Sequence, residues 1–337
     1  MKSDNCRFAR LFLSGSFRSA FPLVICSLHC SNLYIYSSAM LSGSLVRYGS
    51  AGPQVAFLVG AAKARPAKAV VMVGGLTDGL LFAPYVERLS AELSRRGWLA
   101  VHASIQSSWQ GYGTGSLDRD AADLRLLCQH LRTRHDVTGV VLLGHSTGCQ
   151  DTVRYVQRYG PAASAGDHDS ADPAPELLAT ILQAPVSDHE WLCQYPELLP
   201  SVRSARELVA AGRGDQVVGR LHVADNAPIT AARLLSLYEL GGDDDMFSEG
   251  LPREAVQRIL GPVGARPCLL LVSGADECVP YQDAIPDRAA ALKAAIGPSA
   301  SVSIIPGAPH NLAGFEAEAA TAVCAFLESF PNGSINT

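Results

Sequence analysis

The chain has 337 residues, 48% of them hydrophobic, and a formal net charge of -5 at pH 7. This length and hydrophobicity allow one large folded domain, or a domain with an inserted piece, and they exclude the disordered classes of protein. The basic residues are scattered along an acidic chain, which excludes the electrostatic footprint of a nucleic-acid-binding protein. We therefore expect no nucleic acid among its partners.

The nine cysteines are dispersed, and none of them forms a C-x-x-C pair. This pattern predicts neither a disulfide framework nor a zinc ribbon. Cys26, His29 and Cys30 lie close together, but no second ligand cluster accompanies them. We expect mostly reduced thiols, no metal and no cofactor.

Residues 1–40 differ in composition from the rest of the chain, with four basic residues against one acid, Asp4. Such a segment suits a transit peptide for the chloroplast or mitochondrion. Two alternatives are a secretory signal peptide cleaved near Ala39 and a translation start at Met40; without a targeting peptide the protein would be cytoplasmic. The apolar stretch 21–28 is too short to span a bilayer, so we expect no integral membrane span.

From residue 45 onward, strand and helix patterns alternate. Short apolar runs predict strands over 45–48, 55–59, 69–73, 98–101, 140–143, 179–182, 268–272 and 302–305. Periodic apolar positions predict helices over 83–95, 116–134, 150–159 and 316–330. This alternation predicts an α/β fold with a mostly parallel sheet and helices on both faces.

One stretch interrupts this alternation. Between residues 188 and 264 the pattern predicts helices, such as 204–211 and 231–238, and no strand. An insertion at this point would lie over the carboxyl ends of the strands, where open α/β sheets bind ligands. We therefore expect an N-terminal extension over 1–40 and one domain over 41–337 with a helical cap at about 188–264.

The motif Gly144-His-Ser-Thr-Gly148 connects the strand 140–143 directly to the helix 150–159. The backbone must turn sharply here, and the two glycines stand where a Cβ would collide with neighbouring backbone. Such a turn raises the Ser146 hydroxyl above the sheet edge and directs helix amides toward its target. The alternative, a glycine-rich turn with a capping serine, leaves the residues downstream unexplained.

A serine nucleophile needs a base, and usually a carboxylate that orients the base. Asp276 follows the strand 268–272, and His310 follows the strand 302–305. Each lies just beyond the carboxyl end of its strand, in the chain order Ser, Asp, His. The sequence therefore predicts a triad of Ser146, Asp276 and His310.

Other acids and histidines offer weaker candidates. The rival acids are Asp188 and the run Asp243–Asp245, for which we expect a solvated turn. We expect His145 to be a packing residue, because it cannot easily reach the oxygen of its own neighbour. His102 and His222 show no partner pattern.

Acyl chemistry also needs hydrogen-bond donors for the oxyanion. The expected donors are the backbone amide of Thr147 and one amide from the loop after strand 69–73, for which Leu76 is the candidate. The pair Gly74-Gly75 lets this loop approach a ligand closely. Asp78 is a candidate cap for the helix that follows.

Five segments carry a resemblance to a known family: 74–80, 144–151, 184–188, 244–248 and 273–280. They are similar to the α/β-hydrolase superfamily, in a branch that includes fungal esterases of fusarinine-type siderophores, and the likeness covers roughly residues 45–330. The resemblance implies an α/β-hydrolase fold and an esterase that uses Ser146, Asp276 and His310. Because the cap determines specificity, the resemblance does not fix the substrate.

We therefore expect a serine hydrolase that cleaves a small-molecule carboxylic ester through an acyl-serine intermediate. The alternative from another class is a small-molecule receptor on the same scaffold. Acyltransferase, thioesterase and peptidase activities share the acyl-serine and stay open at this point. The sequence gives no oligomeric state.

Overall fold

The centre of the fold is an eight-stranded sheet with the strand order β1-β2-β4-β3-β5-β6-β9-β10. The computed structural model of the chain describes residues 41–60, 68–163 and 173–329. The strands are β1 (Ser44–Arg47), β2 (Val55–Val59), β3 (Lys68–Val73), β4 (Leu99–Ser104), β5 (Gly139–His145), β6 (Glu176–Gln183), β9 (Cys268–Ser273) and β10 (Ala300–Ile305). At one edge β2 pairs antiparallel with both β1 and β4, and the other pairings are parallel.

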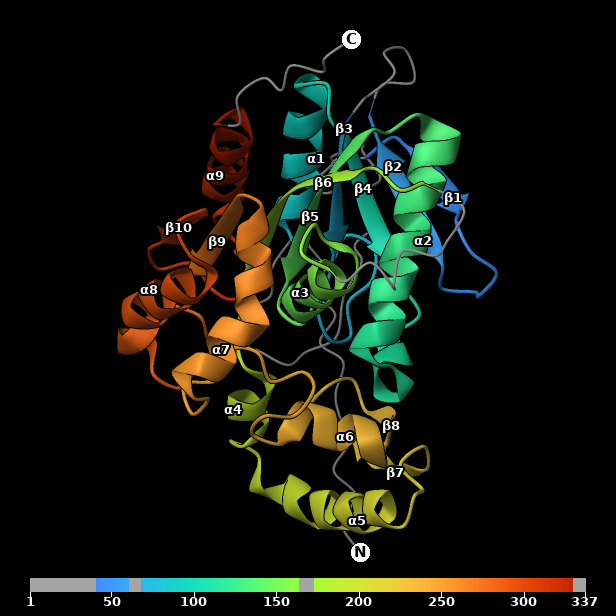
Figure 1. Ribbon diagram of the computed structural model, residues 1–337, viewed down its shortest axis with the longest axis vertical. Coiled ribbons are helices and arrows are strands. Elements are labelled where there is room, and N and C mark those ends of the chain that lie inside the picture. The colour runs from blue at the N-terminus through green and yellow to red at the C-terminus, as the bar shows by residue number, and fades with distance from the viewer. Residues whose placement is uncertain (1–40, 61–67, 164–172, 330–337) are drawn as a thin grey trace, which may run out of the picture. The chain divides into compact units, whose positions relative to one another are not determined.

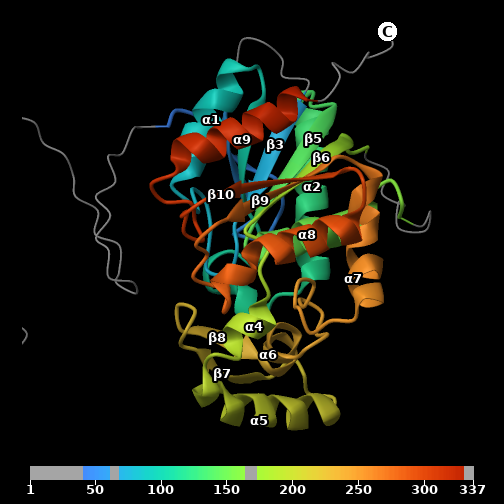
Figure 2. The ribbon, with the colours of Figure 1, turned by 90° about the vertical axis from the view of Figure 1, so that its left-hand side faces the viewer.

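Helices cover both faces of this sheet (Figures 1 and 2). They are α1 (Tyr85–Arg95), α2 (Leu117–His135), α3 (Gly148–Tyr159), α8 (Ile285–Ile296) and α9 (Glu316–Glu328). Val70 and Met72 of β3 pack in one cluster with α1 and α9, whereas Val71 and Val73 pack in another with α2, α3 and α8. The unbroken apolar run of β3 thus serves two buried faces, as expected for a parallel strand.

The observed elements confirm the α/β fold and the predicted strands and helices of the sheet layers. Helix α8, which lies between β9 and β10, is not among the predicted elements. The expectations for residues 1–40, including the Cys26, His29 and Cys30 group, lie outside the described residues. Within the described residues, no helix combines the length and the apolar character needed to cross a bilayer.

The segment that follows β6 contains α4 (Asp188–Leu192), α5 (Leu199–Ala210), β7 (Val217–Leu221), β8 (Ala227–Thr230), α6 (Ala231–Tyr238) and α7 (Arg253–Leu260). The expectation that this segment has no strand is wrong, because β7 and β8 form an antiparallel hairpin. Gly219 and Pro228 interrupt the apolar pattern of these strands, and both residue types weaken a strand signal in sequence. The buried side chains of α4, α5, α6 and the hairpin form their own cluster, whereas α7 packs against α3 and α8.

A buried arginine joins this inserted segment to the main domain. Arg233 of α6 is 3% exposed and forms an ion pair with Asp244, and its Nε donates to the carbonyl of Tyr112 at 3.0 Å. Tyr112 in turn donates its hydroxyl to the carbonyl of Ala224 at 2.6 Å. A buried charge is tolerated only when it is paired and hydrogen-bonded, so these contacts fix how α6 lies against the loop that carries Tyr112.

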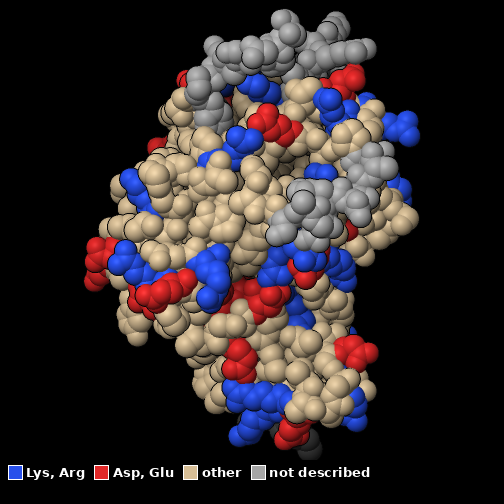
Figure 3. All heavy atoms as spheres, viewed as in Figure 1, with Lys and Arg blue, Asp and Glu red and all other residues tan. Residues whose placement is uncertain are grey.

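Charged side chains of both signs are interspersed on the face of the molecule seen in Figure 3. Exposed ion pairs also occur among the described residues, such as Arg206 with Glu239 at 2.7 Å and Arg266 with Glu176 at 2.7 Å. This face therefore carries no extended field of a single sign.

We expect Arg233→Ala to lower the free energy of unfolding by about 3–5 kcal/mol, because it leaves the buried Asp244 carboxylate without its cation. Arg206→Ala is the matched control, since it removes an arginine of the neighbouring helix α5 from an exposed pair and should cost at most about 1 kcal/mol. Urea unfolding followed by circular dichroism measures both values. Equal losses in the two variants would contradict this account of the buried pair.

Candidate active site

Ser146 occupies a sharp turn between β5 and α3. Its φ is 53°, in the left-handed region, where a non-glycine residue carries strain of about 1–3 kcal/mol. Two backbone hydrogen bonds hold it there, from Ser146 N to Gln183 O at 3.0 Å and from Cys149 N to Ser146 O at 2.8 Å. A Cβ on Gly144 would lie 2.1 Å from the Gly148 carbonyl, and a Cβ on Gly148 would lie 2.5 Å from the Val73 carbonyl. The predicted elbow is therefore confirmed, including the reason for its two glycines.

The loop after β3 lies directly against this elbow. A Cβ on Gly75 would stand 2.6 Å from the Cβ of Ser146 and 3.1 Å from the backbone nitrogen of Thr147. The amide of Leu76 donates a hydrogen bond to Thr147 Oγ1 at 3.2 Å. The two residues predicted as oxyanion donors, Leu76 and Thr147, are thus neighbours beside Ser146.

Asp78 shapes this loop and does not cap a helix. Its Oδ2 accepts a hydrogen bond from the amide of Gly75 at 2.8 Å, whereas helix α1 begins only at Tyr85, after Pro84. Burial raises the pKa of Asp78 to about 6, although the Gly75 amide partly offsets that effect. The expectation of a helix cap is therefore wrong, and the residue instead closes the turn beside Ser146.

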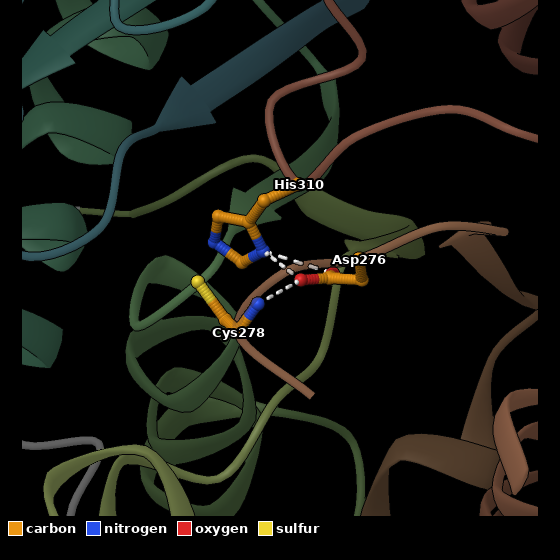
Figure 4. Close-up of side chains that lie close together, drawn as sticks. All are labelled: Asp276, Cys278 and His310. Atoms are coloured by element: carbon orange, nitrogen blue, oxygen red, sulfur yellow. Dashed lines mark hydrogen bonds and ion pairs between the residues drawn. The ribbon is translucent and has the colours of Figure 1, made fainter. Parts of the chain in front are cut away.

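Two loops at the carboxyl ends of β9 and β10 bring Asp276 and His310 together. The loop backbones are joined by hydrogen bonds from Gly274 N to Ile305 O and from Ala275 N to Ala308 O, both at 2.9 Å. His310 Nδ1 lies 2.9 Å from each carboxylate oxygen of Asp276 (Figure 4). Because β9 and β10 are adjacent and parallel, residues that follow their ends meet at one edge of the sheet.

The carboxylate of Asp276 governs the protonation of His310. Burial by itself would lower the pKa of His310, but the adjacent Asp276 carboxylate holds it well above its ordinary value. Asp276 is 2% exposed, so little water screens this interaction. A histidine in this setting is a strong proton acceptor.

Polar side chains at the ends of neighbouring strands contact the backbone of His310 and the ring of His145. The sequence pattern identifies only part of this group of polar residues. Gln183, at the end of β6, donates from Nε2 to the His310 carbonyl at 3.1 Å, and Ser273 donates its hydroxyl to the same carbonyl at 3.2 Å. Gln183 Oε1 also lies 2.5 Å from His145 Nδ1. Polar residues at the ends of buried apolar strands were the available signal for Gln183 and Ser273.

His145 is buried between two rings. It stacks on Phe82 at 5.5 Å between centroids, and its centroid lies 4.9 Å from that of His310. Burial first, and then the charge of His310, lower the pKa of His145 to about 3, so it stays neutral. This environment agrees with the packing role expected for His145, and it places His310 against the residue that precedes Ser146.

The Ser146 hydroxyl makes no hydrogen bond to any other described residue. Its backbone is fixed by the contacts given above, and the His310 ring lies 4.9 Å, between centroids, from the ring of His145, the residue that precedes Ser146. In ligand-free structures the bonds that catalysis uses are often long, and they shorten when a substrate binds.

The rival acids lie elsewhere. Asp188 is buried, accepts a hydrogen bond from Gln150 Nε2 at 2.8 Å, and has a pKa raised to about 8, mainly by burial. The expectation of a solvated turn at 243–245 is wrong for two of its three residues, because Asp244 and Asp245 are 0% and 2% exposed. They bind Arg233 and Ser248, and so they belong to the packing of the inserted segment.

Two further histidines also lie outside the site. His102 is buried in β4 beside the Ser90 hydroxyl, with Nε2 and Oγ 2.8 Å apart, and burial lowers its pKa to about 4. His222 is half exposed, and its Nε2 lies 3.5 Å from Glu197 Oε1. Neither contacts Ser146, Asp276 or His310 among the described interactions.

A small cavity of about 10 Å³ adjoins the loop that carries Leu76. Its lining includes Leu76 and Thr147 together with Asp120, Asp151 and Arg233. Burial raises the pKa of Asp151 well above its ordinary value and that of Asp120 to about 6. The region next to the predicted oxyanion donors is therefore polar.

We expect Gly75→Ala to slow phosphonylation of Ser146 by a fluorophosphonate probe by about 100-fold, because the added Cβ must displace the loop that carries Leu76. Gly52→Ala is the matched control, since a Cβ at Gly52 would meet no atom within 4 Å. Labelling rates, with melting temperatures to confirm folding, measure the effect. A folded Gly75→Ala protein that is labelled at the wild-type rate would show that this loop does not serve Ser146.

Known proteins resemble this chain over most of its length. A UPF0613 protein of Schizosaccharomyces pombe is 34% identical over 270 residues, which cover 72% of this chain and 80% of that protein. Fusarinine C esterase sidJ of Aspergillus fumigatus is 28% identical over 257 residues, covering 64% and 73%. Siderophore hydrolase EstB of Aspergillus fumigatus superposes with a TM-score of 0.70 at 25% identity, covering 87% and 99%. Residues 36–331 match the family described as "Protein of unknown function (DUF1749)", and the chain belongs to that family, on an α/β-hydrolase fold.

Proposed function

We propose that this protein is a serine hydrolase that cleaves a small-molecule carboxylic ester through an acyl-serine intermediate. Relatives named esterase and siderophore hydrolase support the coarser function, an ester hydrolase. The observation that carries the serine mechanism is the pair of His310 and Asp276, 2.9 Å apart, beside a serine held in the left-handed conformation.

In this mechanism, His310 accepts the Ser146 proton at Nε2 while its Nδ1–H stays bonded to Asp276. The freed serine oxygen attacks the ester carbonyl, and the amides of Leu76 and Thr147 donate to the oxygen that becomes negative. His310 then returns the proton to the departing alcohol. A water molecule releases the acyl group by the same steps, with His310 again as the base.

The acceptor of the acyl group separates this proposal from its alternatives. An acyltransferase or thioesterase would use the same Ser146, Asp276 and His310, and differ only in what the pocket admits. The raised pKa of His310, together with the strained backbone of Ser146, favours catalysis over simple binding, because perturbed pKa values and backbone strain cluster at catalytic sites. The names of the relatives direct the first ester panel toward siderophore esters as well as short-chain and aryl esters.

We expect a fluorophosphonate probe to label wild-type protein at Ser146, and Ser146→Ala to lose both labelling and ester hydrolysis. We expect the hydrolysis rate of Ser146→Ala to be lower than that of the wild type by a factor on the order of 10⁴–10⁶. Peptide mass spectrometry locates the label. The matched control is Ser204→Ala, which alters an exposed serine of α5 and should leave both readouts unchanged. A folded wild-type protein that carries no label at Ser146 would contradict the proposal.

We expect the hydrolysis rate to rise with pH as His310 loses its proton, with the midpoint above 6.5, the ordinary pKa of histidine. Asp276→Asn removes the charge that raises the His310 pKa, so the midpoint should move to lower pH and the maximal rate should fall by about 10⁴-fold. Profiles of kcat/KM against pH measure both effects.

Glu277→Gln is the matched control for this profile, because it neutralises the neighbouring exposed carboxylate. Among the described residues, Glu277 accepts from the backbone amide of His310, at 2.8 Å, and has no bond to the His310 ring, so its loss should shift the midpoint much less. Identical shifts in the two variants would show that Asp276 does not have the special role assigned to it.

A further inference from the structure

We propose that Asp276, Cys278 and His310 form a binding site for Zn²⁺, and that an ion bound there inhibits the enzyme. The binding site stands on the geometry of these three side chains, whereas the inhibition rests on the function proposed above for His310. The group brings together a carboxylate, a thiol and an imidazole, the three side-chain types that bind zinc.

The donor atoms of the three side chains lie close together. One ligand atom of each side chain lies within 4.8 Å of the other two, and among the described residues no other such group occurs. Figure 4 shows the thiol of Cys278 beside the ring of His310, with the Asp276 carboxylate on the far side of the ring. Atoms that share a zinc ion at bond lengths of about 2.0–2.3 Å lie roughly 3–4 Å apart. Because His310 Nδ1 and Asp276 already lie 2.9 Å apart, the Cys278 thiol is the donor that must move when an ion binds.

The three ligands differ in exposure in a way that suits entry of an ion. Asp276 is buried, the His310 side chain is 13% exposed, and Cys278 is partly exposed. The backbone of the site is fixed, because the amide of Cys278 donates to Asp276 Oδ1 at 2.9 Å. Three protein ligands on two adjoining loops, with Cys278 partly exposed, match the arrangement of zinc sites that keep an exchangeable position.

A bound ion would be incompatible with the proposed catalysis. Zinc would take the lone pair of His310 Nδ1, the nitrogen beside Asp276, after the ring proton has moved from Nδ1 to Nε2, and an electron pair of the Cys278 thiolate, whose proton passes to solvent. An imidazole bound in this way no longer accepts the Ser146 proton. Because the ligands must be deprotonated, binding strengthens as pH rises.

The other described cysteines provide an internal comparison. Cys128, Cys149, Cys268 and Cys324 are buried, and Cys193 is exposed. Cys193 stands beside a histidine, with its Sγ 3.6 Å from His189 Nδ1, but no carboxylate completes a group of three there among the described residues. Cys193 is therefore the matched control for a thiol that has an imidazole neighbour and lacks the third ligand.

The first experiment measures binding without using activity. The full-length protein is alkylated with iodoacetamide in the presence of zinc chloride or magnesium chloride, and modification is read at each cysteine by peptide mass spectrometry. We expect zinc, and not magnesium, to slow alkylation of Cys278 by about tenfold or more, with a smaller effect at Cys193. Reading each peptide separately keeps Cys26 and Cys30 out of the result.

The second experiment measures inhibition. Zinc should inhibit ester hydrolysis by the wild type, and a chelator should restore the rate. Relative to its own zinc-free rate, Cys278→Val should need about tenfold more zinc or more for half-inhibition, whereas Cys193→Val should behave as the wild type. A melting curve for each variant checks that it is folded.

The outcomes separate this inference from the proposed function. Unprotected Cys278 in an active wild-type enzyme would overturn the zinc site and leave the esterase proposal intact. Protected Cys278 in a protein that hydrolyses no ester would overturn the esterase proposal and leave the zinc site intact. Equal zinc sensitivity of Cys278→Val and wild type would show that inhibition arises elsewhere, and would overturn the assignment of Cys278.

Discussion

The left-handed conformation of Ser146 is the constraint on which the rest of the site depends. A residue with φ of 53° is held only where its surroundings over-determine the backbone. Here the amide of Ser146 is bound to the end of β6, and Gly148 packs against the end of β3. Contacts with β3 and β6, the two neighbours of β5, thus hold this turn in place. Because these strands belong to a sheet that is buried on both faces, they can keep Ser146 in its strained conformation.

The rings of His145 and His310 lie 4.9 Å apart between centroids, but the pKa values of the two residues are shifted in opposite directions. The difference comes from their neighbours. His145 is bound to a neutral amide, and burial lowers its pKa to about 3. His310 faces a carboxylate, and its pKa is raised well above the ordinary value. A neutral His145 places no like charge under His310, so the imidazolium that forms during acyl transfer has the Asp276 charge as its nearest partner. The same arrangement makes His310 and its neighbours suitable ligands for a cation.

Buried polar groups hold the inserted segment to the main domain. Arg233 is a cation surrounded by several buried carboxyls, among them Asp244, Asp120 and Asp151. Burial first, and then the charges of neighbouring carboxylates, raise the pKa of Asp151, and burial together with Asp244 raises that of Asp188 to about 8. The Asp188 carboxyl is therefore neutral at pH 7. The contacts of Arg233 with Asp244 and with the Tyr112 carbonyl fix how α6 lies, because a buried charge must be paired and hydrogen-bonded.

The sequence by itself determined the sheet, the elbow and the residues of the predicted triad. Apolar runs and glycine spacing are local signals, and the chain order of Ser146, Asp276 and His310 follows from the ends of parallel strands. Tertiary structure alone decided what surrounds them. Asp78 closes a turn, Asp244 and Asp245 are buried, and Gln183, Ser273 and Cys278 meet at His310, although up to 127 residues separate these groups along the chain. Partner choice for a polar side chain depends on which strand ends become neighbours, and a single sequence carries no local record of that pairing.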